Sequence, residues 1–138
     1  MEKARQHPAV MPLHRALPVT FCLLAMPLAA DDLLVLPSGL EVTLQEVLWE
    51  DEAETGRFRF IVPTIAAPGG ADGVMLDDML LLCRDFALPV QRALRPGWAE
   101  LVISFASEPS EFGVMNAEIV QFFEGFGIDG DDCIWSEF

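Results

Sequence analysis

The sequence predicts a single α+β domain, a mixed sheet of about five strands with two helices packed on it. Three observations support this fold class. Segments 40–49 and 57–63 alternate apolar and polar residues with the period of two that half-buried strands show. Residues 71–94 instead repeat apolar residues every three or four positions, as an amphipathic helix does. The first thirty residues differ from the rest in composition and are expected to be removed.

The N-terminal segment, residues 1–30, is predicted to be a secretory signal peptide. Basic residues precede an uncharged apolar run at 16–30 that ends in small residues, which is typical of such signals, and Met11 is an alternative start. A membrane-spanning helix needs about 20 apolar residues, whereas this run is shorter and contains two prolines. We therefore expect cleavage near Ala30, no stable membrane span after signal removal, and a periplasmic or secreted location for residues 31–138.

The acidic balance of the remaining chain disfavours several classes of partner. Residues 31–138 contain five arginines and 21 acidic residues, a net charge of −16, with no lysine, histidine or tyrosine. A surface of this charge repels the phosphates of nucleic acids and the head groups of anionic lipids. The chain is also rich in Leu, Val, Ile and Phe, so we expect it to fold. Any partner of the acidic surface should therefore be cationic.

The first part of the domain is predicted to form three strands. Residues 33–36 are a short apolar run, and 40–49 form a longer strand. One face of the longer strand is expected to carry the apolar residues Leu40, Val42, Leu44 and Leu48. Glu46 falls on the same face and is the exception. The acidic segment 50–56 is the predicted hairpin loop; its tip is either a cation or partner site or, as is usual for charged tips, only solvated. In 57–63 the arginines should point outward and three apolar side chains inward: Phe58, Phe60 and Val62.

The central segment, residues 71–94, is predicted to be helical from Asp72 onward, because an aspartate can cap the first turn. Its apolar stripe should face the sheet and is formed by Leu76, Met79, Leu80, Cys83, Phe86 and Val90. The opposite side should carry the charged residues Asp77, Asp78, Arg84 and Asp85. Pro89 should end or kink this helix near Leu88, with 88–94 as a second short helix.

The last part of the domain is predicted to contain a strand, a helix and a strand. Residues 99–107 are predicted to form a strand with Leu101, Ile103 and Phe105 on one face, and Val102 on the other face favours a central strand. Residues 116–126 place Ile119, Phe122, Phe123 and Phe126 at helical spacing, so this segment is predicted to be a helix. Residues 133–137 close the fold as a final strand.

The missing residue types exclude much of enzyme chemistry. Without histidine, lysine or tyrosine, residues 31–138 cannot form a Ser-His-Asp triad, a Schiff base or a histidine zinc site. No glycine-rich phosphate loop is present, so no cofactor is expected. Carboxylates remain, and two of them can hydrolyse a glycosidic bond. No pair among the acidic residues stands out for this role, so the sequence predicts no catalytic residue.

A weak candidate for a metal site lies before the last strand. Asp129, Asp131 and Asp132 surround Gly130, which faintly resembles a calcium loop. A calcium loop has ligands at alternate positions and a glutamate at its twelfth position, and this segment has neither. An exposed acidic turn is the simpler interpretation.

The two cysteines left after signal removal, Cys83 and Cys133, are predicted to form a structural disulfide. Cysteines with a redox role usually have Cys-x-x-Cys spacing, whereas these lie 50 positions apart. The bond would join the central helix to the last strand.

Several segments resemble an uncharacterised family of small exported bacterial proteins: RFRFIVP, LCRDFALP (82–89), ELVISFASEPSEFG (100–113), QFFEGF (121–126) and CIWSEF (133–138). The resemblance covers the whole chain after the signal. It implies export but no activity, since the family has none established. Some members carry the name acetolactate synthase, but a thiamine-diphosphate enzyme needs a far larger chain and a cofactor-binding motif.

Two functional hypotheses follow from these observations. The first is an exported acidic protein that acts as a non-catalytic binding or envelope-associated module. The alternative is a carboxylate-dependent hydrolase that acts on periplasmic glycan. A cleft with two carboxyl groups roughly 5 to 10 Å apart would favour the hydrolase.

Overall fold

A computed structural model of the chain describes residues 33–68 and 75–136; the predicted signal peptide, residues 1–30, lies outside these ranges. Six strands in the described ranges form one sheet whose order in space follows the order in sequence. The strands are β1 (Leu33–Val35), β2 (Glu41–Glu50), β3 (Thr55–Ile61), β4 (Glu100–Ala106), β5 (Gln121–Asp129) and β6 (Asp132–Ser136).

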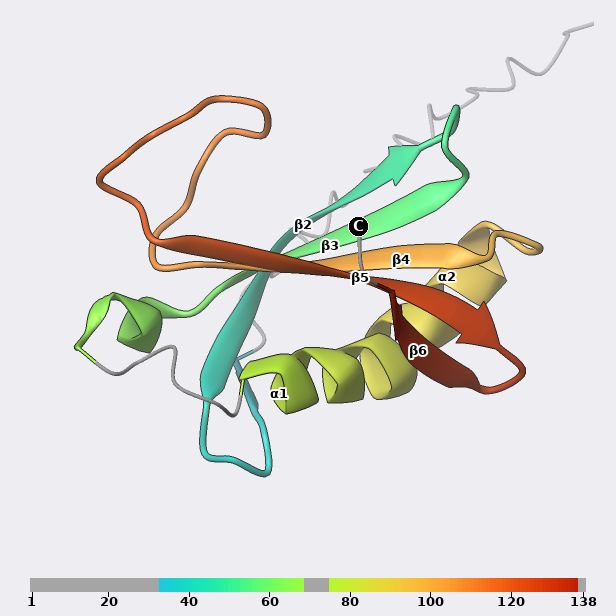
Figure 1. Cartoon of the computed structure of the whole chain (residues 1–138), viewed down its shortest axis with the longest axis horizontal. Helices are drawn as coiled ribbons and strands as arrows, with labels where there is room; N and C mark the ends of the chain where they lie inside the picture. Colours follow the sequence, from blue (N-terminus) through green and yellow to red (C-terminus); the bar gives the residue numbers. More distant parts are fainter. Residues whose placement is uncertain (1–32, 69–74, 137–138) are drawn as a thin grey trace, which may run out of the picture.

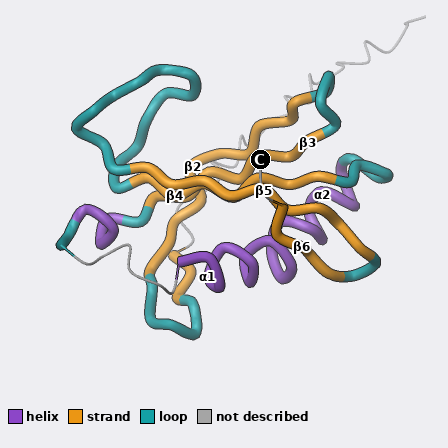
Figure 2. The backbone as a smooth tube through the Cα atoms, in the orientation of Figure 1, coloured by secondary structure: helices purple, strands orange, loops and turns teal. Residues whose placement is uncertain are grey.

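The sheet is mixed because one pair of neighbours, β3 and β4, runs parallel while the others are antiparallel. A helical crossover joins these two strands and consists of α1 (Met75–Leu82), the π-helical segment η2 (Cys83–Ala87) and α2 (Leu88–Leu94). A short 3-10 helix, η1 (Pro63–Ala66), follows β3. Figure 1 shows the helices on one face of a curled sheet, while the loop between β4 and β5 rises on the other side. This loop, residues 107–120, is hereafter the long loop (Figure 2).

The predicted class, α+β with a mixed sheet, is confirmed, although the element counts differ. The part of the chain that the structure describes has six strands, not five, and its α-helical residues lie in one crossover segment. The core lies between this segment and the sheet. Phe86 of the helix meets Phe58 and Phe60 of β3 edge to face, with ring centroids 6.3 and 5.8 Å apart. Among the described residues, no helix is long and apolar enough to cross a membrane.

A bulge in β2 explains the exception that Glu46 made to the strand pattern. Leu44 pairs with Phe60 of β3, but the next pair is Glu46 with Arg59, so Gln45 is an extra residue. The extra residue exchanges the two faces of the strand. The prediction that Leu48 shares the face of Leu44 was therefore wrong; after the bulge Val47 and Trp49 pack against the core.

The central helix crosses Pro89 without ending there, because its geometry changes first. Leu88 donates its backbone N–H to the carbonyl of Cys83, five residues earlier, which is a π-type hydrogen bond. The extra residue of this turn shifts the buried stripe from Phe86 and Val90, which are half-buried, to positions such as Leu88 that are fully buried. The predicted second helix over 88–94 is confirmed as α2. At the other end Asp78, expected at the surface, is buried and accepts a hydrogen bond from Ser38.

The predicted helix over 116–126 is wrong, because residues 121–129 form β5. The spacing of the phenylalanines fits a helix, but Phe122, Phe126 and Ile128 also fit a period of two. The strand is the more stable choice because β5 pairs along its length with β4 and also with β6. Aromatic residues are favourable in such half-buried strands.

Gln91 of α2 connects the helix to the sheet from a fully buried position. Its side-chain amide donates to the backbone carbonyls of Trp98 and Glu100, at 3.3 and 3.1 Å. Its Oε1 atom lies over Gly56 of β3, so close that a Cβ atom added to this glycine would be 2.2 Å away. The absence of a side chain at Gly56 thus makes room for the glutamine.

Candidate binding site between the long loop and the sheet

A hollow of about 330 Å³ lies on the face of the sheet that the helices leave open. It is formed by β3, β4, β5 and the long loop. The residues that line it are Arg57, Arg59, Ser104, Glu111, Phe112, Gly113, Val114, Met115, Gln121, Phe122 and Phe123. Its size is at the lower end of the range for small-molecule sites, about 300 to 1,000 Å³.

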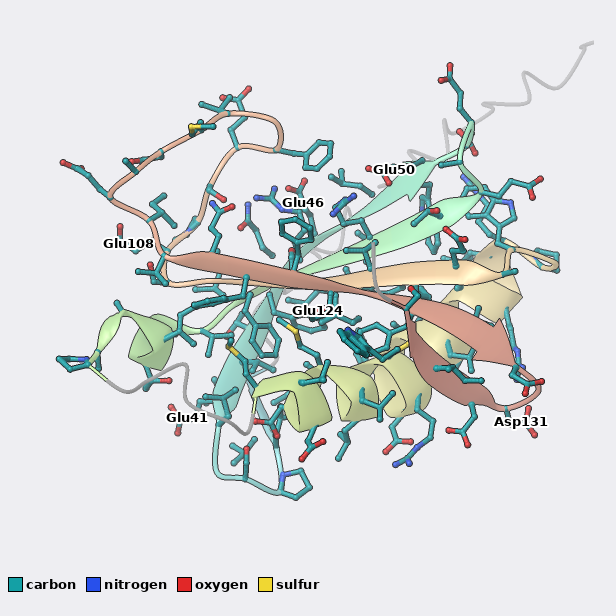
Figure 3. All side chains as sticks on the ribbon, viewed as in Figure 1. Glu41, Glu46, Glu50, Glu108, Glu124 and Asp131 are labelled. Carbon is teal, nitrogen blue, oxygen red and sulfur yellow. A yellow bond between two sulfur atoms is a disulfide. The ribbon has the colours of Figure 1, made fainter. Side chains whose placement is uncertain are left out.

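Two arginines of β3 form the polar part of the hollow. Because side chains alternate along a strand, Arg57 and Arg59 point away from the core, in which Phe58 and Phe60 are buried. Arg57 donates through Nε and NH2 to both oxygens of Glu50, at 3.1 and 3.3 Å. Arg59 donates through NH1 to Glu46. Glu46 and Glu50 both lie on the long-loop side of the sheet in Figure 3, and each cation is balanced by its own carboxylate.

The base of the long loop is held in place at Ser110, which is buried. The extra residue of the β2 bulge, Gln45, donates its side-chain amide to the Ser110 carbonyl at 2.8 Å and accepts from the Ser110 N–H at 3.4 Å. Arg59 and Gln121 donate to the Ser110 hydroxyl, at 2.7 and 3.0 Å. The bulge therefore has a structural purpose, since it aims a glutamine at the backbone of the loop.

Beyond this anchor the long loop presents apolar side chains to solvent. Phe112 is 49% exposed, Val114 53% and Met115 97%. The ring of Phe112 lies over both guanidinium groups, 5.2 Å from that of Arg57 and 5.7 Å from that of Arg59. Cation–π contacts of this kind are worth about 0.5 to 1 kcal/mol at exposed sites. Phe112 thus shields the arginines while it contributes an apolar wall to the hollow.

The charge on this side of the molecule is negative. The long loop carries three exposed glutamates, Glu108, Glu111 and Glu118, and residues 96–138 contain no basic residue. Figure 3 shows Glu108 at the base of the loop. Because Glu50 and Glu46 balance the charges of Arg57 and Arg59, the glutamates of the long loop determine the net charge around the hollow.

Comparison of the sequence with models of known protein families identifies one family. The profile of DUF6497, a family of unknown function, matches residues 20–138. The chain belongs to this family. This agrees with the resemblance to an uncharacterised family. Searches of curated proteins and of solved structures found no match to this DUF6497 chain.

The predicted cysteine pair lies at disulfide distance in this DUF6497 chain. The sulfur atoms of Cys83 and Cys133 are 2.10 Å apart and the Cα atoms 6.2 Å apart. Both side chains are buried, at the point where η2 passes the edge strand β6. The pair lies on the helix face of the sheet and takes no part in the hollow.

The acidic turn before β6 does not gather its carboxylates into a metal site. In the ranges 33–68 and 75–136, no three residues of the His, Cys, Asp and Glu types are arranged to hold a metal ion. Arg92 of α2 contacts the turn between Asp129 and Asp132 instead. It donates to Asp131 at 2.6 Å and to the Gly130 carbonyl, so the turn makes a surface contact with the helix.

A second surface pair lies on the helix, remote from the hollow. Arg84 donates to both carboxylate oxygens of Asp85, at 2.7 and 3.0 Å. The hydrogen bond from Arg84 lowers the pKa of Asp85 below its ordinary 3.8. The hydrogen bond to Asp85 in turn raises the pKa of Arg84. Both groups are solvent-exposed, so the pair is a surface feature without a site around it.

The sequence patterns did not predict the hollow between the long loop and the sheet. They placed the two arginines on the outer face, but they did not bring these arginines together with the segment that follows the strand predicted at 99–107. One signal was available: Phe112, Val114 and Met115 are consecutive or nearly so in a segment without strand or helix character. Apolar residues in an exposed loop are unusual enough to suggest contact with a partner.

Proposed function

We propose that this protein is an exported, non-catalytic binding module whose binding surface is the hollow under the long loop. The observation that carries this proposal is the combination of a firmly held loop base with an exposed apolar wall. Four hydrogen bonds fix Ser110, whereas Met115 is almost fully exposed. Exposed apolar patches beside a concave surface mark interaction sites, and a rigid base reduces the entropy lost on binding.

The chemistry of the lining supports binding over glycan hydrolysis. A two-carboxylate mechanism needs an acid and a second carboxylate at a defined separation. Glu111 is the carboxylate among the lining residues of the hollow. The nearby Glu46 and Glu50 are each held by an arginine of β3, so neither carboxylate is free to pair with Glu111 across a bound substrate.

A direct test is NMR titration of the ¹⁵N-labelled protein with N-acetyl-L-phenylalaninamide, a neutral aromatic probe. We expect the backbone amide signals of residues 112–115 and of Ser104 and Gln121 to shift, with affinity in the millimolar range that suits so small a contact. Val114→Asp should abolish the shifts. Val35→Asp is the matched control, because Val35 is 64% exposed on the far edge strand β1.

Unchanged spectra for the wild-type protein at all probe concentrations would refute the proposal. Release of soluble sugar fragments from purified peptidoglycan, lost in Glu111→Gln, would instead support the hydrolase. The same substitution should leave binding of the neutral probe unaltered.

Export rests on the basic and apolar pattern of residues 1–30 and gains support from the cysteine pair, because disulfides persist in oxidising compartments. Intact-mass measurement of the protein expressed with its full N-terminus should give a chain that begins near Asp31 in the periplasmic fraction. Recovery of the uncut chain from the cytosol would contradict this part of the proposal.

A further inference from the structure

We infer that the hollow recognises a cationic protein segment in which an apolar or aromatic side chain is flanked by lysine or arginine. This inference rests on the proposed function and specifies the partner of the same site. It follows from the charge pairing in the hollow, from the distribution of glutamates on the long loop, and from the apolar wall.

The arginines in the hollow do not make it a site for anions. Arg57 donates two hydrogen bonds to Glu50. Arg59 donates one to Glu46 and one to the Ser110 hydroxyl. An anionic ligand would have to displace these carboxylates in a domain, residues 31–138, whose net charge is already −16. Breaking a partly buried ion pair leaves a charge without a partner, which is costly. Phe112 in addition covers both guanidinium groups.

The carboxylates of the long loop favour a cation, and their spacing favours an extended one. Glu111 lines the hollow, while Glu108 and Glu118 are exposed three positions before it and seven after it. A small amine in the hollow would meet Glu111 alone. A peptide that crosses the loop can place several basic side chains near several glutamates, and such complementary charges also speed association.

The apolar wall provides the contact that gives this segment a fixed position. Phe112, Val114 and Met115 border a volume of about 330 Å³, which has room for one large side chain but not for a folded domain. Methionine adapts its shape to different partners. Binding energy in protein contacts comes mostly from such an apolar anchor, while the charged rim contributes little affinity and more selectivity.

The test uses four blocked pentapeptides with the wild-type protein. In three of them a central Phe lies between two pairs of Lys, Gln or Glu; in the fourth a central Gly replaces the Phe between the lysines. Dissociation constants are measured by NMR titration at about 20 mM and about 300 mM salt. We expect the Lys-flanked Phe peptide to bind about tenfold more tightly than the Gln-flanked one at low salt, and the difference to shrink at high salt. The Glu-flanked and the Gly-centred peptides should bind most weakly.

Two double variants show where the charge acts. Glu111→Gln with Glu118→Gln should remove most of the preference for the Lys-flanked peptide. Glu41→Gln with Glu52→Gln changes the net charge equally but at exposed positions of β2 and its hairpin, outside the lining of the hollow, and should leave the preference within about twofold of wild type.

The outcomes separate this inference from the function on which it rests. Equal affinity for the Lys- and Gln-flanked peptides, or tighter binding of the Glu-flanked one, overturns the cationic partner while the hollow remains a binding site. An equal loss of preference in both double variants overturns recognition by the loop in favour of net charge alone. If neither these peptides nor N-acetyl-L-phenylalaninamide shifts the signals of the hollow, the proposed function fails as well.

Discussion

The link between Cys83 and Cys133 offers the sharpest test of how this fold is stabilised. The two residues are separated by 50 positions in sequence. A bond between them closes a chain segment that contains α2, β4, the long loop and β5. The chain-entropy relation for a closed loop of this length gives a stabilisation of about 4 kcal/mol. That is a large share of the roughly 5 to 15 kcal/mol by which a domain is stable.

Replacement of both cysteines by alanine should therefore lower the melting temperature by about 15 to 30 °C, since 1 kcal/mol corresponds to roughly 4 to 8 °C in a domain near this size. Thermal unfolding followed by circular dichroism, with and without reductant, provides the measurement. Reductant should lower the melting temperature of the wild-type protein but not that of the double variant. Because reduction removes no atoms from the core, it separates the effect of the bond from that of a cavity.

Two results would refute this reasoning. One is a double variant that melts within a few degrees of the wild type. The other is titration of two free thiols per chain in protein recovered from an oxidising compartment and unfolded under non-reducing conditions.

Three further predictions concern individual contacts. Gly56→Ala should destabilise the fold by about 1 to 3 kcal/mol, since its Cβ would lie 2.2 Å from Gln91; Gly127→Ala, whose Cβ would meet only the Ile134 carbonyl at 4.0 Å, should be near neutral in the same urea titration. Gln45→Met removes both hydrogen bonds to the Ser110 backbone and should cost about 1 to 2 kcal/mol, with faster hydrogen exchange in the long loop than in Gln121→Met, which loses one bond. NMR titration of Asp85 should give a pKa below 3.8, and Arg84→Gln should bring this pKa back towards 3.8. Because folding lowers the pKa of Asp85, the small stabilisation by this pair is present at neutral pH and is lost on acidification.

Strands whose apolar pattern repeats without interruption could be predicted from the sequence. The alternation in β3 and β4 correctly placed Phe58, Phe60, Leu101 and Ile103 in the core. The failures in β2 and in the central helix share one physical cause, which is a single extra residue. Gln45 in β2 and the π turn at Cys83–Ala87 each shift the pattern by one position. A period measured from one end then predicts the wrong face beyond the shift.

The β5 segment failed for a different reason. Phe122 and Phe126 satisfy both the helical and the extended period, and a local pattern cannot decide between them. Pairing with β4 and β6 decides, and these contacts involve residues distant in sequence. The hollow was missed for the same reason, because it unites β3, β4, β5 and a loop that no short-range pattern connects.

The two faces of the sheet differ in composition, and this difference supports the binding role proposed for the open face. The helix face contains the continuous apolar core and the cysteine pair, which together stabilise the domain. The open face carries the exposed side chains of Val114 and Met115, whose contact with water contributes nothing to folding. Natural sequences tend to lose such residues unless a partner covers them, because they promote aggregation. Hydrogen bonds within the chain, from Gln45, Arg59 and Gln121, hold Ser110, so the base of the apolar wall is fixed by the fold itself. A surface that is both costly to expose and held ready in this way is better explained by recognition than by folding.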